Sequence, residues 1–184
     1  MSKQLDKILI IDIEATCWKG KIPKGQQNEI IEIGICVLDT ASGERVASDS
    51  ILVKPKSEIS EFCTELTTLT RADVENQGIC FEEACAVLKN EYLSKQYTWA
   101  SYGDYDRRQF ERECQEKQVG YPFGTSHINI KNLLALTQSW KREVGMATAL
   151  ERLALPLEGT HHRGVDDARN IAGILAWLLK SVRN

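Results

Sequence analysis

Two carboxylates end a short apolar segment near the start of the chain. In "ILIIDIEAT", Asp12 and Glu14 stand two residues apart, so a strand places both on one face, together with Ile8 and Ile10. Carboxylates a few ångströms apart raise each other's pKa unless a cation lies between them. Ligand sites in α/β sheets lie at the carboxyl ends of strands. The pair therefore indicates a hard divalent metal ion, with solvated carboxylates at an exposed strand end as the alternative.

A second acidic stretch, "HHRGVDDARN", comes just before the apolar segment that ends the chain. At about 100° per residue, a helix from about Val165 to Val182 gathers its apolar residues on one arc. Asp167 lies at the edge of that arc and is predicted to face the sheet, whereas Asp166 falls on the opposite side with Asn170. An inward carboxylate costs several kcal/mol unless it is paired or metal-bound. Asp166 is interpreted as a first-turn acid that complements the helix dipole.

A third acidic stretch, "WASYGDYDRRQF", joins a predicted strand to a predicted helix. Asp104 is in a good position to be the N-cap of that helix. Asp106 lies one turn before Phe110, on the face expected to pack inward. Each of the two aspartates is explained by capping when it is considered alone.

The two histidines of "HHRGVDDARN" lie in a predicted loop between Gly159 and Gly164. Glycines make this loop flexible, so either His161 or His162 can reach the sheet. A histidine in a loop is more often a surface residue than a catalytic one. The residues alone leave the choice between the two open.

The composition is typical of one compact domain, expected to span residues 1–184. The polar start of the chain indicates no secretion signal, no apolar run is long enough to span a bilayer, and the cytoplasm is the expected compartment. A net charge of −3 argues against a protein that coats DNA through a basic surface. The cysteines lack paired spacing and are predicted to be reduced, mostly buried thiols: Cys17, Cys36, Cys63, Cys80, Cys85 and Cys114.

Hydrophobic periodicity predicts strands first and then strands alternating with helices. Strands are expected at residues 7–13, 29–39, 44–55 and 97–101, with a turn at 40–43, a short helix after Pro55 and a capping box at Thr70 and Asp73. Further helices are expected at 81–93, 106–117, 146–155 and about 165–182, and residues 127–140 as a short strand running into a helix. This order predicts an α/β fold with a central mixed β-sheet flanked by α-helices.

The three acidic stretches together resemble the DEDDh 3′–5′ exonucleases, which have an RNase H-like fold. The resemblance rests on D-x-E in the first strand, an aromatic-Asp pair at the start of a middle helix, and H-x-x-x-x-D before the last helix. The segments "DIEATCW", "NEIIEIGICVLD", "FCTELTTLT", "YDRRQF", "HINIKNL" and "HHRGVDDARNIA" are similar to the Eri-type exoribonuclease branch. The resemblance covers nearly the whole chain.

The resemblance implies a site for two Mg²⁺ ions, with Mn²⁺ able to replace them, held by Asp12, Glu14, Asp106 and Asp167. Glu14 would also help to hold the attacking water, and His162 would be the general base. The residues themselves leave Asp104 as the alternative to Asp106. The implied reaction releases nucleoside 5′-monophosphates one at a time from a free 3′ end.

The resemblance also implies where the terminal nucleotide binds. Ala15 and Thr16 would lie along it, Leu66 would wedge the last base, and Tyr105 would line the site. Side chains that could contact phosphates, although a solvated surface role is commoner for each, are Lys19, Arg107, Arg108 and Arg163. Single-stranded RNA is the favoured partner, with no membrane and no protein partner identified. The alternatives are a DNA-directed proofreading or repair exonuclease and a non-catalytic nucleic-acid-binding module.

Overall fold

A five-stranded mixed sheet forms the centre of the computed structural model, which describes residues 4–183. Residues 1–3 and residue 184 lie outside the described part, so the two ends of the expected domain are not described. The strand order is β3-β2-β1-β4-β5, in which β1 pairs antiparallel with β2 and parallel with β4. The strands are β1 (Gln4–Ala15), β2 (Ile30–Asp39), β3 (Arg45–Leu52), β4 (Tyr97–Ser101) and β5 (His127–Asn129).

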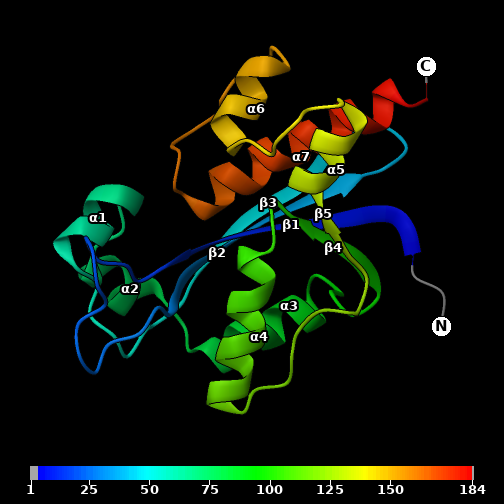
Figure 1. The fold of residues 1–184 in the computed structure, drawn as a ribbon. Coiled ribbons are helices and arrows are strands. Elements are labelled where there is room, and N and C mark those ends of the chain that lie inside the picture. Colours follow the sequence, from blue (N-terminus) through cyan, green and yellow to red (C-terminus); the bar gives the residue numbers. More distant parts are fainter. Residues whose placement is uncertain (1–3, 184) are drawn as a thin grey trace.

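Helices cover both faces of this sheet (Figure 1). One face packs against α5 (Ile130–Thr137), α6 (Met146–Arg152) and α7 (Gly164–Ser181), and the other against α3 (Phe81–Asn90) and α4 (Tyr105–Lys117). A smaller cluster joins α1 (Glu61–Thr67) and α2 (Arg71–Gln77) to the start of β2. The predicted mixed sheet with flanking helices is confirmed.

The alternation along β1 divides the core as the sequence predicts. Ile8 and Ile10 belong to the cluster under α7, whereas Leu9, Ile11 and Ile13 belong to the cluster under α3 and α4. Because side chains alternate along a strand, Asp12 and Glu14 continue the α7 face. The acidic end of β1 is therefore directed toward the helix that carries Asp167.

Most predicted elements are confirmed, with shifted ends. Thr70 and Asp73 form the expected capping box, at the start of α2, and the turn at 40–43 has Gly43 at φ 77°. Two short helices, not one, follow Pro55, and β3 ends at Leu52. All six cysteines are free thiols, four of them buried. No helix among the described residues is long and apolar enough to cross a membrane.

One prediction for α7 is wrong. The face that carries Asp166 and Asn170 was expected to point to solvent, but Asn170 is buried and binds both backbone groups of Glu158. Asp166 is half-buried and accepts a hydrogen bond from the backbone N–H of Thr160 at 2.8 Å. The reason is a long-range contact, since the segment before α7 folds back along this face. Val182, expected on the core side, is 70% exposed just beyond the end of α7.

Candidate active site

Three carboxylates from two elements meet above the end of β1. Asp12 and Glu14 come from β1 and Asp167 from the first turn of α7, and one oxygen of each lies within 4.8 Å of the others. Glu14 is 9% and Asp167 4% exposed. The structure therefore brings together three of the four acids expected to bind metal.

These carboxylates lie in a strongly acidic surrounding. Burial and the neighbouring charges of Asp106, Asp167 and Glu14 raise the pKa of Asp12 well above its usual value. Burial and the charge of Asp167 raise the pKa of Glu14 to about 8. Burial also raises the pKa of Asp167, although His161 and the backbone of His162 act in the opposite direction. Carboxyls in this state hold protons that a divalent cation can replace.

Asp106 lies beside this group, at the first turn of α4. It is 5% exposed, and its Oδ1 accepts a hydrogen bond from the backbone N–H of Ile13 at 3.1 Å. Burial raises the pKa of Asp106 to about 6, and its charge acts on both Asp12 and Glu14. Asp104 differs: its side chain is 36% exposed and contacts Arg107 at 3.3 Å. Asp104 occupies the N-cap position without a capping hydrogen bond from its side chain, so its expected capping role is wrong.

Two glycines fix the position of α7 on the sheet. A Cβ on Gly34 of β2 would lie 1.9 Å from the backbone carbonyl of Gly164, the first residue of α7. Gly34 pairs with Asp12 in the β1–β2 register. The helix can therefore begin directly on the sheet, next to the strand that carries Asp12. This contact places Asp167, in the first turn, over the acidic end of β1.

Glu32 is a residue of this region that the sequence analysis missed. It lies opposite Glu14 in the β1–β2 register and is fully buried. Its carboxylate accepts hydrogen bonds from Arg163 Nε at 3.1 Å and from the backbone N–H of Gly164 at 3.0 Å. Arg163, expected as a possible phosphate contact, thus holds the start of α7 to β2. The one glutamate inside the otherwise apolar run "IIEIGICVL" was the signal that could have revealed this role.

The two histidines differ in how they contact Asp167. Nδ1 of His161 lies 3.0 Å from Asp167 Oδ2, whereas His162 donates its backbone N–H to the same oxygen at 3.0 Å. The two rings stack with their centroids 4.0 Å apart, and His162 has a φ of 66°. A nitrogen of each ring lies within 4.8 Å of an Asp167 oxygen and of the other. Burial, with the neighbouring His161, lowers the pKa of His162 from the near-neutral value expected for it.

Comparison with known proteins assigns the chain to a family. The model of the RNase_T exonuclease family matches residues 9–175. The chain belongs to this exonuclease family. It is 32% identical to human ERI1 exoribonuclease 2 over 202 residues and 31% identical to rat 3′-5′ exoribonuclease 1 over 188 residues. The resemblance stated from the sequence is therefore confirmed.

Solved structures agree with this assignment. The nuclease domain of 3′hExo, a DEDDh family member solved with rAMP, has a TM-score of 0.81 and 28% identity, and the match covers 98% of this chain and 95% of that one. The two curated relatives are longer proteins. The match covers 96% and 95% of this exonuclease but only 29% and 53% of their lengths.

The residues expected to contact the terminal nucleotide of a substrate lie at or just after the end of β1, in α1 and at the start of α4 of this exonuclease. Tyr105, the first residue of α4, is 56% exposed, and Leu66 is half-buried near the end of α1. Ala15 is 7% exposed and Thr16 is fully buried. The Thr16 hydroxyl donates to the carbonyl of Gln27 and accepts from the N–H of Glu29, so its only donor hydrogen is already used within the chain.

Proposed function

We propose that this exonuclease removes nucleotides one at a time from the 3′ end of single-stranded RNA and releases nucleoside 5′-monophosphates. The observation that carries the proposal is the group of three carboxylates, half-buried Asp12 and buried Glu14 and Asp167, with which no lysine or arginine side chain of the described residues forms an ion pair. Such a group is unfavourable in a folded protein unless it binds a cation. The family is one of divalent-metal-dependent exonucleases.

The donor set fits Mg²⁺, with Mn²⁺ as a substitute. Hard divalent cations prefer carboxylate oxygens, and Asp12, Glu14 and Asp167 each offer one close to the others. Asp106 is the proposed fourth acid because it is buried against β1 and acts electrostatically on Asp12. When bound, the ions neutralise the phosphate and lower the pKa of a water molecule.

His162 is the proposed general base. An imidazole nitrogen of His162 takes a proton from the attacking water as the water oxygen bonds to the terminal phosphorus and the bond to the preceding 3′-oxygen breaks. Its lowered pKa keeps the ring neutral, and so able to accept a proton, at neutral pH. The backbone of His162 also holds Asp167, which orients that carboxylate toward β1.

The proposed binding of the terminal nucleotide uses residues on both sides of the acidic group. Ala15 would lie along the nucleotide, Leu66 of α1 would contact the base, and Tyr105 of α4 would line the other side. Thr16 would contribute through its place in the backbone next to Ala15, since its hydroxyl is engaged with Gln27.

RNA is the proposed substrate because the similar proteins are named exoribonucleases. One solved relative, at 28% identity, is described as a 3′-exonuclease that recognises the 3′ end of a histone mRNA stem-loop. Activity on DNA is the second candidate, favoured by the same phosphate chemistry at the acidic group.

Matched RNA and DNA oligomers with a label at the 5′ end test the proposal. With Mg²⁺, the expected result is a ladder of RNA products shortened one residue at a time, with nucleoside 5′-monophosphates identified by mass spectrometry. Blocking the 3′ hydroxyl with a terminal phosphate ester should slow the reaction. Internal cleavage, or no cleavage of either polymer, would overturn the proposal, and faster loss of the DNA would identify DNA as the substrate.

A further inference from the structure

The segment that follows β1 carries a local positive charge in an acidic protein. Residues 17–27, here called the lysine loop, contain Lys19, Lys21 and Lys24, and no aspartate or glutamate occurs between Glu14 and Glu29. The whole chain has a net charge of −3. The lysine loop is therefore a region of opposite sign next to the acidic end of β1.

The three ammonium groups have no partner among the described residues. All three lysines are exposed, and no hydrogen bond or ion pair in the described part of the chain engages their side chains. Some cationic side chains of the described residues are paired, as Arg45 is with Glu158 and Lys117 with Glu29. The charge of the lysine loop is thus available to an external anion.

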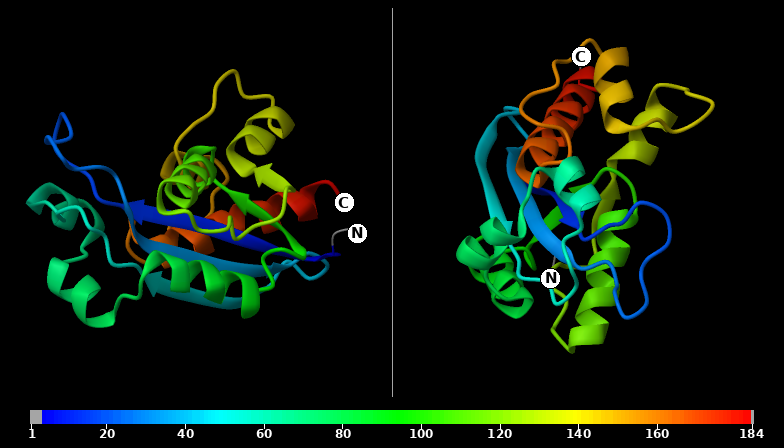
Figure 2. Two further views of the ribbon diagram at one scale, coloured as in Figure 1. Left: turned by 90° about the horizontal axis from the view of Figure 1, so that it is seen from below. Right: turned by 90° about the vertical axis from the view of Figure 1, so that its left-hand side faces the viewer.

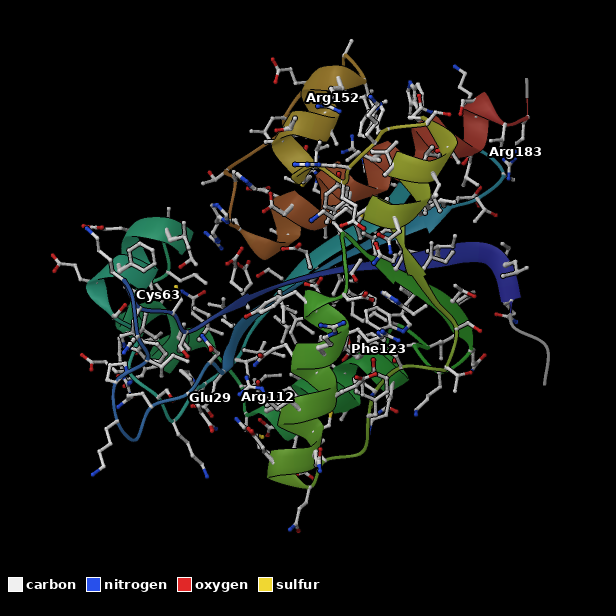
Figure 3. All side chains as sticks on the ribbon, in the orientation of Figure 1. Glu29, Cys63, Arg112, Phe123, Arg152 and Arg183 are labelled. Carbon is white, nitrogen blue, oxygen red and sulfur yellow. The ribbon has the colours of Figure 1, made fainter. Side chains whose placement is uncertain are left out.

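The lysine loop is held firmly at its base. The backbone N–H of Thr16 donates to the carbonyl of Glu29 at 2.8 Å, and Asn28 Nδ2 donates to the carbonyl of Thr16 at 2.6 Å. Ser60, the N-cap of α1, donates to the carbonyl of Cys17 at 2.6 Å. Cys63 of the same helix contacts the carbonyl of Ala15, and Figure 3 shows its side chain within this part of the molecule. The lysines therefore extend from a fixed attachment beside the expected site for the terminal nucleotide.

The loop projects on the side of the sheet where α4 lies. Both views of Figure 2 show the segment after β1 extending from the molecule on that side, with the end of β1 at its base. Glu14, at the end of β1, belongs to the acidic group, and Asp106, in the first turn of α4, lies beside it. The lysine loop is therefore attached next to the end of β1 that carries Glu14.

Apolar side chains lie among the lysines. Trp18 is half-buried next to Lys19, and Ile22, between Lys21 and Lys24, is 47% exposed. Proteins that bind single-stranded nucleic acid without sequence preference combine cations, which follow the phosphates, with aromatic surfaces, on which bases stack. The lysine loop has both kinds of side chain in one short segment.

We infer that the lysine loop binds the phosphates of a single-stranded RNA on the 5′ side of the nucleotide being removed. The inference rests on the proposed exonuclease function and adds a second contact region to it. The acidic group would hold the scissile phosphate through cations, and the lysine loop would hold the following phosphates directly. An acidic protein surface is the other possible occupant, and the test separates the two.

The test compares two triple variants with the same change of charge. Lys19→Gln, Lys21→Gln and Lys24→Gln remove the charge of the lysine loop. The control, Lys7→Gln, Lys89→Gln and Lys180→Gln, removes the same charge from the first third of β1 and from the last turns of α3 and α7. Each protein is assayed on an oligouridylate of about 12 nucleotides and on the dinucleotide UpU over a range of salt concentrations.

The loop variant should raise KM for the oligouridylate about tenfold and lower the salt dependence of log kcat/KM by about 2, because each phosphate contact on a single strand contributes about 0.7. UpU has no phosphate beyond the scissile one, so its kcat/KM should change by less than about twofold. The control variant should resemble the unmodified protein on both substrates.

Three results would overturn the inference. A loop variant equal to the control would show that the strand does not reach the lysines and would leave an acidic protein as the occupant. An equal loss on UpU and the oligomer would place the lysines at the terminal nucleotide or in the fold. If the unmodified protein hydrolyses neither substrate, the proposed function itself fails and the inference fails with it.

Discussion

Two groups of largely buried carboxylates lie on opposite faces of the same sheet, and they differ in whether a cation of the chain pairs with them. Between α4 and the start of β2, Lys117 Nζ lies 2.9 Å from both Glu29 and Glu113, each of which is almost fully buried. Figure 3 shows Glu29 in this region. On the α7 face, Asp12 and Glu14 have no such cation within the described residues. One group is paired with a lysine of the chain, and the other has no lysine or arginine partner among the described residues.

The pKa values follow this difference. Burial raises the pKa of Glu29, but hydrogen bonds from Lys117 and Ser57 outweigh burial and hold it below its usual value. Burial and the charge of Asp167 raise the pKa of Glu14 to about 8. Buried acids alone therefore do not mark an active site, because paired acids serve the fold. Buried acids without a cation mark the position where the protein needs one from solution.

The largest effects should come from removing one acid from each group. Asp12→Asn, Asp106→Asn and Asp167→Asn should each reduce turnover by about 10³-fold or more, because each removes charge that the reaction needs. Glu113→Gln should instead destabilise the fold by about 3 kcal/mol, since it leaves Lys117 without one buried partner. Steady-state assays and urea denaturation measure both quantities. The comparison breaks if Glu113→Gln abolishes turnover in folded protein while Asp167→Asn retains it.

The next largest effect separates the two histidines. His162→Ala should lower turnover by about 10²–10⁴-fold, the usual contribution of a positioned base. His161→Ala should lower it by only a few fold, because a lost hydrogen bond to Asp167 contributes about 1 kcal/mol. Both variants should keep the stabilisation by Mn²⁺, since neither removes a carboxylate. The opposite order of the two variants would transfer the role of base to His161.

The pH–rate profile refines this prediction. Because burial and His161 lower the pKa of His162, the rising limb of kcat/KM should lie below about 6.5, the ordinary histidine value. The limb should move or disappear in His162→Ala. A rising limb of kcat/KM above about 6.5 that is unchanged in His162→Ala would show that another group controls the pH dependence.

The two groups should also give opposite pH dependences of stability. Folded Glu14 holds its proton up to about pH 8 and the unfolded chain only to about 4.5, so without metal the free energy of unfolding should fall by a few kcal/mol as pH rises through that interval. The pH dependence due to Glu29 has the opposite sign. Its contribution to stability is present above the pKa of the unfolded chain and is lost as the pH falls through the lowered pKa of the folded state.

Melting temperatures in EDTA measure this difference. Glu14→Gln should reduce the fall in melting temperature between about pH 5 and 8. Glu29→Gln should reduce the fall in melting temperature at acid pH. Mn²⁺ should remove the fall in the unmodified protein, with a gain in melting temperature that increases with pH. A gain that is independent of pH would contradict the proton-for-metal exchange.

The smallest effects should come from the neighbouring aspartates. Asp104→Ala should change stability by less than about 0.5 kcal/mol, because its contact with Arg107 is an exposed ion pair. Asp166→Ala should cost about 1 kcal/mol, because it removes the acceptor for the Thr160 N–H. Turnover should remain near normal in both. Loss of turnover in Asp104→Ala, with turnover retained in Asp106→Ala, would show that Asp104 is the fourth metal-binding acid in place of Asp106.

Local patterns predicted the parts of the site that depend on local geometry. Alternation in "ILIIDIEAT" placed Asp12 and Glu14 on the α7 face, and the helical arc chose Asp167 over Asp166. These predictions need only the period of a strand and of a helix.

Contacts between distant segments were not predictable in the same way. The segment before α7 covers Asn170, and Glu32 holds Arg163 across 131 residues of sequence. Asp104 failed as a cap because its side chain turned to Arg107, a choice of rotamer that spacing does not determine. The sequence thus predicted which acids face inward. Which of the buried acids are paired with a lysine or arginine could be learned only from the structure.

Calorimetric titration of Mn²⁺ into the metal-free protein at neutral pH tests the central claim most directly. The unpaired acids should bind Mn²⁺, Asp12→Asn should lose that binding, and Glu113→Gln should retain it because Glu113 belongs to the group that is already paired with Lys117. The absence of binding to the unmodified protein, or equal binding by the Asp12→Asn variant, would contradict the account.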